Sequence, residues 1–146
     1  MKKLRAISKY MLMIVGIILL SSASNTNVDC DDVDFLDDCA AQIQGYKYLK
    51  ANKVNITEEG NSVELSSVFS TGSTYILTAC SGGPGMMVTL YDRTKKKIMN
   101  NFNSAKKTYY PSITYKCNAT GVYYIKYEFE NGGVGCGVGI VGFTKN

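Results

Sequence analysis

Five cysteines are the residues of this sequence with the most evident chemistry. They are Cys30, Cys39, Cys80, Cys117 and Cys136. Zinc-binding thiols come in close pairs such as C-x-x-C, and none of these spacings provides one, so disulfides are favoured over a metal centre. An odd number leaves one thiol over, and about 15 pairings are possible. Because Cys80, Cys117 and Cys136 lie at expected strand ends, we expect two bonds drawn from those three plus one of Cys30 and Cys39.

Nucleophilic and acid–base catalysis have little support in this chain. The sequence contains no His, which excludes Ser-His-Asp, Cys-His and His-metal sites. Glu128 and Glu130 share one face of an expected strand, where they read as solvated edge residues rather than a glycosidase pair. The run Gly137–Gly142 fits G-x-G-x-x-G, but a dinucleotide site needs a helix after the glycines and only four residues remain. We therefore expect no enzyme.

An acidic run, Asp29-Cys30-Asp31-Asp32-Val33-Asp34, suggests a hard cation. An EF-hand loop that begins at Asp29 would place Asp34 where glycine is required and Ala40 where the bidentate Glu belongs. We interpret these acids as groups that favour the start of a helix, and we predict no metal site and no cofactor.

A binding surface is the remaining chemical possibility. A basic segment without acidic residues runs from position 93 to 107 and ends beside two tyrosines. Its candidate ligand-binding residues are Arg93, Lys95, Lys96, Lys97, Tyr109 and Tyr110. Exposed tyrosines with lysines suit an anionic polysaccharide or an acidic protein surface. The alternative is a solvated basic loop over tyrosines that belong to the core.

The first 24 residues have the pattern of a cleaved secretory signal peptide. Basic residues precede the apolar run Met11–Leu20, and Ser21–Ser24 offers small residues for cleavage. Removing the four basic residues of this leader from the total of 16 leaves 12, equal to the 12 acidic residues. The mature chain is formally neutral, so we predict no nucleic-acid partner. No second apolar run of comparable length follows the leader, so we predict no membrane span after cleavage and a secreted, periplasmic or cell-surface location. Its oligomeric state stays open.

The remaining chain, residues 25–146, has the length of one domain and a mainly β pattern. Apolar residues at helical spacing predict a helix over about 31–44, across an end or an open edge of the sheets. Short alternating runs separated by Gly and Asn turns then predict seven or eight strands. We therefore predict an antiparallel β-sandwich of the jelly-roll kind.

The last two runs predict a pair of strands. From Val122 to Glu130 aromatic and aliphatic residues alternate with polar ones, and alternation resumes from Val134. Asn131-Gly132-Gly133 accepts positive φ, so we expect the two runs to pair as a hairpin. Glycines that alternate along the second run should let large side chains of a neighbouring strand lie over its backbone.

Three further stretches carry a resemblance to a known family. They are Val63–Leu77, Val88–Asp92 and Ile113–Ile125, the last with the turn Ala119-Thr120-Gly121-Val122-Tyr123-Tyr124. Over roughly residues 60–130 the chain resembles the bacterial pre-peptidase C-terminal domain, a jelly-roll-like sandwich attached to secreted proteases and other exported enzymes. Residues 82–87 lack the carboxylates that precede the corresponding strand in calcium-binding members, so calcium is not implied.

Together these features predict an exported, non-catalytic binding or accessory module. It would contact polysaccharide or a protein at or outside the cell surface. The alternative is a structural or matrix protein of the envelope with no specific ligand.

Overall fold

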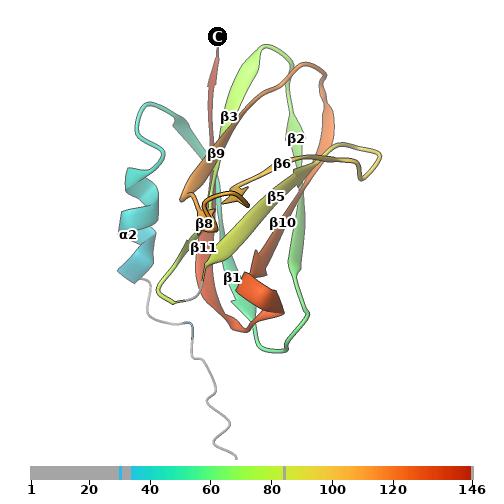
Figure 1. Cartoon of the computed structure of the whole chain (residues 1–146). Coiled ribbons are helices and arrows are strands. Elements are labelled where there is room, and N and C mark those ends of the chain that lie inside the picture. Colours follow the sequence, from blue (N-terminus) through green and yellow to red (C-terminus); the bar gives the residue numbers. More distant parts are fainter. Residues whose placement is uncertain (1–29, 31–33, 84, 146) are drawn as a thin grey trace, which may run out of the picture.

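Two antiparallel sheets lie face to face, with one short helix on the outside of the first (Figure 1). The computed structural model describes residue 30 and residues 34–83 and 85–145. The predicted leader, Asp29 and Asp31–Val33 lie outside the described residues. The predicted antiparallel β-sandwich with one helix is confirmed.

Each sheet is built from strands that are distant in the sequence. Sheet A has the order β1 (Lys47–Ile56), β11 (Gly135–Lys145), β3 (Ser73–Thr78) and β9 (Ser112–Lys116), and β4 (Cys80–Ser81) also pairs with β11. Sheet B has the order β2 (Val63–Phe69), β10 (Gly121–Phe129), β5 (Met86–Tyr91) and β6 (Lys97–Asn100). A separate ribbon pairs β7 (Phe102–Asn103) with β8 (Thr108–Tyr109).

Strand β10 supplies much of the core between the sheets. Tyr123, Ile125, Tyr127 and Phe129 are all buried, with exposed fractions of 6%, 1%, 0% and 2%. The intervening side chains from Val122 to Glu128 point outward and are partly or fully exposed. The alternation predicted from the sequence is confirmed, and burial of this aromatic face is the main force that joins the sheets.

The predicted hairpin between β10 and β11 is wrong, because the two strands belong to different sheets. After Phe129 the segment Glu130–Gly132 forms a 3-10 turn in which Asn131 has φ 56° and Gly132 has φ 69°. These residues do accept positive φ, but the turn carries the chain across the sandwich. Strand β11 then pairs with β1 on one side and β3 on the other.

The alternate glycines of β11 face the core, as expected, and large side chains lie over them. A Cβ at Gly139 would overlap the Tyr127 ring, and one at Gly137 would lie 2.6 Å from the Met86 sulfur. Glycine therefore allows the two sheets to approach closely along β11.

The helix α2 (Asp34–Ala41) is shorter than predicted and lies elsewhere. Three residues of the expected range lie outside the described part, and the chain beyond Ala41 continues in turns to Gly45, which has φ 85°. The helix covers the outer face of sheet A rather than an end or open edge, and it contacts β11 and β4. Its buried Cys39 packs with Val138 and Ile140, whose side chains lie on the face of β11 opposite the core glycines.

Two disulfides connect the N-terminal part to sheet A, and they account for four of the five cysteines. Cys30 is bonded to Cys136 and Cys39 to Cys80, with Cα–Cα distances of 5.5 and 5.7 Å, and Cys117 is a buried free thiol. Two bonds and one leftover thiol were predicted correctly. The favoured set was wrong, because Cys117 points into the core at the end of β9 while both N-terminal cysteines reach strands of sheet A.

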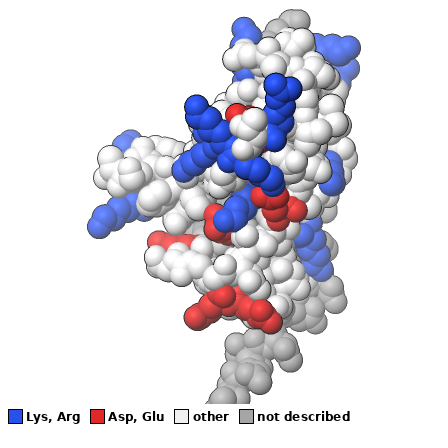
Figure 2. Space-filling model, turned by 90° about the vertical axis from the view of Figure 1, so that its right-hand side faces the viewer, with Lys and Arg blue, Asp and Glu red and all other residues white. Residues whose placement is uncertain are grey.

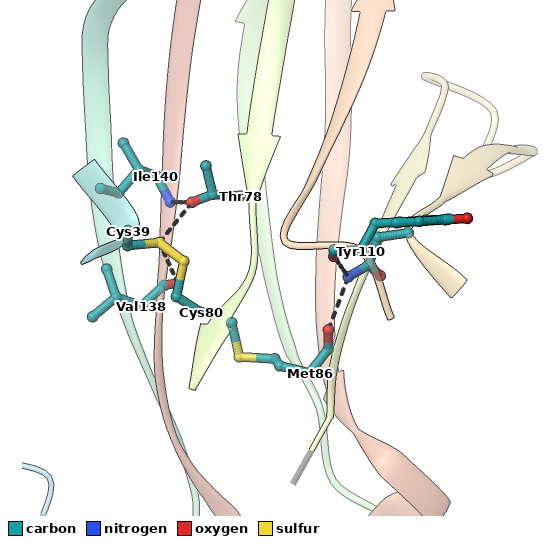
Figure 3. Close-up of a disulfide and its surroundings, with 8 residues drawn as sticks. Cys39, Thr78, Cys80, Met86, Tyr110, Val138 and Ile140 are labelled. Atoms are coloured by element: carbon teal, nitrogen blue, oxygen red, sulfur yellow. Dashed lines mark hydrogen bonds between the residues drawn. A yellow bond between two sulfur atoms is a disulfide. The ribbon is translucent and has the colours of Figure 1, made fainter. Parts of the chain in front are cut away.

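The bond between Cys39 and Cys80 fixes α2 to the sheet (Figure 3). The Thr78 hydroxyl lies 2.9 Å from the Cys39 sulfur and accepts the Ile140 N–H at 2.8 Å. A disulfide sulfur carries no hydrogen, so Thr78 donates to it. Within the described part of the chain, no helix combines the length and apolar character of a membrane span.

Candidate functional site

The basic segment from 93 to 107 is not one long loop, as the sequence suggested. It contains a tight turn between β5 and β6 and a second, separate turn between β7 and β8. The strands β6, β7 and β8 have two to four residues each and little alternation, so the sequence pattern did not reveal them.

The β5–β6 turn, residues 92–96, is held in shape by Asp92. The Asp92 N–H donates to the Lys96 carbonyl at 2.9 Å, and the Lys95 N–H donates to the Asp92 carbonyl at 3.0 Å. The carboxylate oxygen Oδ1 accepts the Thr94 N–H at 2.8 Å, the Thr94 hydroxyl at 2.7 Å and the Lys96 N–H at 3.0 Å. These bonds, that of the Thr94 hydroxyl first, hold the pKa of Asp92 below its usual value. The turn is therefore a preorganised projection at the end of sheet B.

Lys95 is already occupied by contacts within the protein. Its ammonium forms an ion pair with Glu64 and lies 3.4 Å from the centre of the Tyr124 ring. Its backbone has φ 62°, the left-handed conformation that completes a three-residue hairpin loop of this kind. Lys95 thus supports the turn more than it offers a charge to a ligand.

Arg93, Lys96 and Lys97 are exposed around the same turn. Seen from the side on which the turn projects in Figure 1, Lys and Arg side chains gather in the centre of the surface (Figure 2). The four cations that sequence analysis selected all belong to the β5–β6 turn or to the first residue of β6, although Lys95 differs in role.

A cleft of about 450 Å³ opens beside this turn, and we call it the turn cleft. One wall comes from the β5–β6 hairpin and the other from β9 and the start of β10. Its lining residues are Asp92, Arg93, Thr94, Ile98, Tyr115, Ala119, Thr120, Gly121, Val122 and Tyr123. Ile98 and Val122 are 37% and 40% exposed, so the cleft offers apolar surface next to positive charge.

Two phenols lie along the cleft wall that β9 and β10 form. The Tyr123 hydroxyl donates to the Ala119 carbonyl at 2.8 Å, the pattern known as a tyrosine corner in Greek-key sandwiches. The Tyr115 hydroxyl lies 3.4 Å from that of Tyr123, a long contact. The Cys117 thiol donates to the same Ala119 carbonyl at 3.2 Å. Burial, then hydrogen bonds from Tyr115 and Cys117, raise the pKa of Tyr123, which stays protonated.

Tyr109 and Tyr110 are not part of this site. The side-chain amide of buried Asn101 donates to the Tyr110 carbonyl at 2.7 Å and to the Met86 carbonyl at 3.0 Å. Figure 3 labels Tyr110 and Met86, and these bonds hold the tyrosine pair beside the beginning of β5. Arg93 follows the other end of that strand. The structure therefore separates the tyrosines from the cations with which the sequence grouped them.

The tyrosine pair lines a second, more open cleft of about 410 Å³ between α2 and the β4–β5 loop. The Tyr109 ring is half-buried, 4.7 Å from that of Phe102, and burial raises its pKa. Tyr110 is 43% exposed and its hydroxyl accepts the Asn103 amide at 3.3 Å. The alternative interpretation, in which these tyrosines belong to the core, therefore fits Tyr109 better than Tyr110.

The acidic side chains in the described part of the chain form no pair suited to acid–base catalysis. Glu128 forms an ion pair with Lys126 at 2.8 Å, and Glu130 lies beyond β10 in the 3-10 turn rather than on the same strand. Within the described ranges, no group of three or more Cys, Asp or Glu side chains could hold a metal ion.

Sequence reasoning missed the walls of the turn cleft. Ile98 belongs to β6, a strand of four residues that the sequence pattern did not reveal. Tyr115 and Val122 were expected in strands, but no binding role was predicted for them. The useful signal was the stretch Ala119–Tyr124, which we singled out for a family resemblance and which supplies five lining residues.

Comparison with known proteins gives a fold relationship. No family model and no curated protein matches the chain. Among solved structures, the chain is similar to Aeromonas hydrophila PliG, a periplasmic lysozyme inhibitor of g-type lysozyme, with 12% identity and a TM-score of 0.50. The match covers 69% of this chain and 90% of that one. The sandwich is thus of a kind also found in a periplasmic inhibitor protein.

Proposed function

We propose that this chain is an exported, non-catalytic binding module that contacts a protein partner through the β5–β6 turn and the turn cleft. The observation that carries the proposal is the rigid basic turn beside a cleft whose lining includes exposed aliphatic side chains. Binding sites are commonly placed on loops that a rigid scaffold positions, and this turn is fixed by the contacts of Asp92 and Lys95.

Export is supported by the leader pattern and by the disulfides. Both bonds close long segments, of 106 and 41 residues. Such bonds persist in oxidising compartments and are rare in the cytosol. We place the mature chain in the periplasm, at the cell surface or outside the cell.

A protein partner is favoured over polysaccharide for two reasons. The similar solved structure is named as an inhibitor of a protein, g-type lysozyme. In addition, exposed aliphatic side chains at the turn cleft suit a protein surface, since interface centres are apolar with polar rims. The absence of His from the sequence agrees with a module that binds rather than catalyses.

The resemblance to pre-peptidase C-terminal domains suggests a different setting for the same role. In that case the module would assist an exported hydrolase. A structural envelope protein without a ligand remains the rival function, and the experiment below separates it from a binding module.

The test measures binding of the mature chain, residues 25–146, to purified g-type lysozyme and to exported proteins captured by cross-linking and then purified. A partner should bind saturably, and the variant Lys96→Ala/Lys97→Ala should slow association and reduce its salt dependence. The variant Lys47→Ala/Lys50→Ala is the matched control, because it removes the same charge from β1, an edge strand of the other sheet. Its association should be close to that of the wild type.

Two outcomes would contradict the proposal. One is the absence of saturable binding to lysozyme and to each purified captured protein, which would favour the structural role. The other is a partner whose association responds equally to both double variants.

A further inference from the structure

The turn cleft differs from an ordinary surface hollow because its cation has no internal partner among the described residues. Lys95 pairs with Glu64, and Lys126 pairs with Glu128. Within residues 34–83 and 85–145, no carboxylate lies within ion-pair distance of Arg93. Its guanidinium therefore remains available at the cleft entrance.

Asp92 lines the same cleft and carries a negative charge, so Asp92 and Arg93 leave the lining formally neutral. Its Oδ1 atom already accepts three hydrogen bonds from Thr94 and Lys96. Lys96 and Lys97 do not line the cleft, but they are exposed on the same turn, where the positive charges outnumber the Asp92 carboxylate. The local balance favours an anionic ligand group.

The opposite side of the cleft adds a donor and an apolar surface. The Tyr115 hydroxyl has only a long contact, 3.4 Å, to Tyr123, so it can turn toward a ligand oxygen. Ile98 and Val122 provide aliphatic surface from the two walls, and Val68, 63% exposed, pairs with Val122 on the neighbouring strand. An anionic group and an aliphatic group can thus be held side by side.

We infer that the turn cleft binds an acidic loop of the partner protein, with a carboxylate on Arg93 and an adjacent aliphatic side chain between Ile98 and Val122. This inference rests on the proposed function for its biological partner. Arg93 is the specificity-determining residue, because a guanidinium binds a carboxylate through two parallel hydrogen bonds and an ammonium does not. A volume of about 450 Å³ is large enough for two or three side chains.

The inference can be tested with peptides, before any partner is known. Amide chemical shifts of the isotope-labelled mature chain are followed during titration with the capped tripeptide Ac-Glu-Leu-Glu-NH2. Saturable shifts should appear at Thr94, Gly121 and Val122. The neutral peptide Ac-Gln-Leu-Gln-NH2 should bind about 10-fold more weakly, and Ac-Glu-Gly-Glu-NH2 about 5-fold more weakly, since each lacks one of the two contacts.

Variants assign the effect to Arg93. Arg93→Ala should weaken binding of the acidic peptide about 10-fold and Arg93→Lys about 3-fold or more, whereas Lys47→Ala, with the same change in charge, should alter it less than about 2-fold. Equal effects of Arg93→Ala and Lys47→Ala would overturn the inference, as would shifts that map away from the cleft or fail to saturate by about 10 mM peptide.

The two proposals fail in different ways. If a protein partner binds but Arg93→Ala leaves its affinity unchanged, the binding function stands and the cleft assignment is wrong. If the acidic peptide binds as described while no protein partner is found, the cleft is confirmed as an acidic-ligand site and the protein-binding function is not.

Discussion

Lys95 combines a strained backbone with favourable side-chain contacts, and substitutions can measure the energetic effect of each. A left-handed conformation costs a non-glycine residue about 1 to 2 kcal/mol, while an exposed ion pair contributes about 0 to 1 kcal/mol. The Glu64 contact and the Tyr124 ring thus offset part of the cost of the turn.

We predict that Lys95→Gly is more stable than Lys95→Ala by about 1 kcal/mol, because both variants lack the ammonium and only glycine accepts φ 62° freely. Urea unfolding monitored by circular dichroism measures the difference. Equal stability of the two variants would show that the turn relaxes when the lysine is removed.

Asn101 is a second residue with a specific structural role. Its buried amide donates to Met86 and Tyr110, and its Oδ1 accepts the Val88 N–H at 2.8 Å. It therefore joins the start of β5 to the segment that follows β8.

Asn101→Asp should destabilise the protein by about 3 kcal/mol or more at neutral pH, since it replaces two donors by an acceptor and buries a charge. Asn55→Asp, at an exposed position of β1, is the control and should change stability by less than about 0.5 kcal/mol. Chemical denaturation of both variants is the measurement. A mild effect at Asn101 would mean that water replaces the lost bonds.

At the scale of elements, β11 depends on its core-facing glycines. Adding a methyl group at Gly139 places it in the Tyr127 ring, which is itself fully buried. The Tyr127 hydroxyl has no hydrogen-bond partner among the described residues, and burial raises its pKa.

Gly139→Ala should therefore destabilise the fold by about 2 to 4 kcal/mol through overpacking. Gly121→Ala, where no atom lies within 4 Å of the added carbon, is the matched control on β10. Thermal unfolding of the two variants compares them. Equal losses of stability in the two variants would show that the overlap with Tyr127 is not the cause.

The sequence predicted the elements better than their partners. Alternation located β10 because its two faces meet core and solvent. Strand β11 lies between the core and α2 with both faces mostly buried, so its apolar residues alternate with glycines rather than with polar residues. Which sheet receives it depends on packing, and a turn that accepts positive φ fits a sheet crossing as well as a hairpin.

The candidate site shows the same limit. Its cations were identified by charge, but the cleft walls come from β6, β9 and β10, which are brought together only by the two sheets. The partner of each cysteine was likewise undetermined, because spacing along the chain does not give distance in space.

At the scale of the whole molecule, the thiol content follows from the disulfide pattern. Titration of the denatured, unreduced mature protein should find about one thiol, that of Cys117. Replacing Cys39 and Cys80 by Ser should lower the free energy of unfolding by about 2 to 4 kcal/mol, since the bond closes a segment of 41 residues and holds α2 to sheet A. Five titratable thiols would contradict the expected oxidising location.

Stability should also depend on pH at both extremes. The lowered pKa of Asp92 stabilises the fold above the unfolded value of 3.8, and this contribution is lost as pH falls through the lower folded value. The raised pKa of Lys126, caused first by its hydrogen bond to Glu128, stabilises the fold below 10.5 and is lost as pH rises beyond it. Chemical denaturation measures the free energy of unfolding of each variant and of the wild type. The difference between Asp92→Asn and the wild type should shrink below pH 3.8. The difference between Lys126→Gln and the wild type should shrink above pH 10.5.

The central place of β11 has a consequence for how the protein is made. Strands β1 and β3 are synthesised early, yet they do not pair with each other; β3 can pair with β9, but β1 and the second edge of β3 need a strand that begins at Gly135. A nascent chain that is still missing residues 135–145 leaves two long strand edges open and Cys30 without its partner Cys136. Sheet A is therefore complete only after residues 135–145 have been made, so a chain exported through a secretory leader would keep this sheet open while the preceding residues are threaded through a translocation channel.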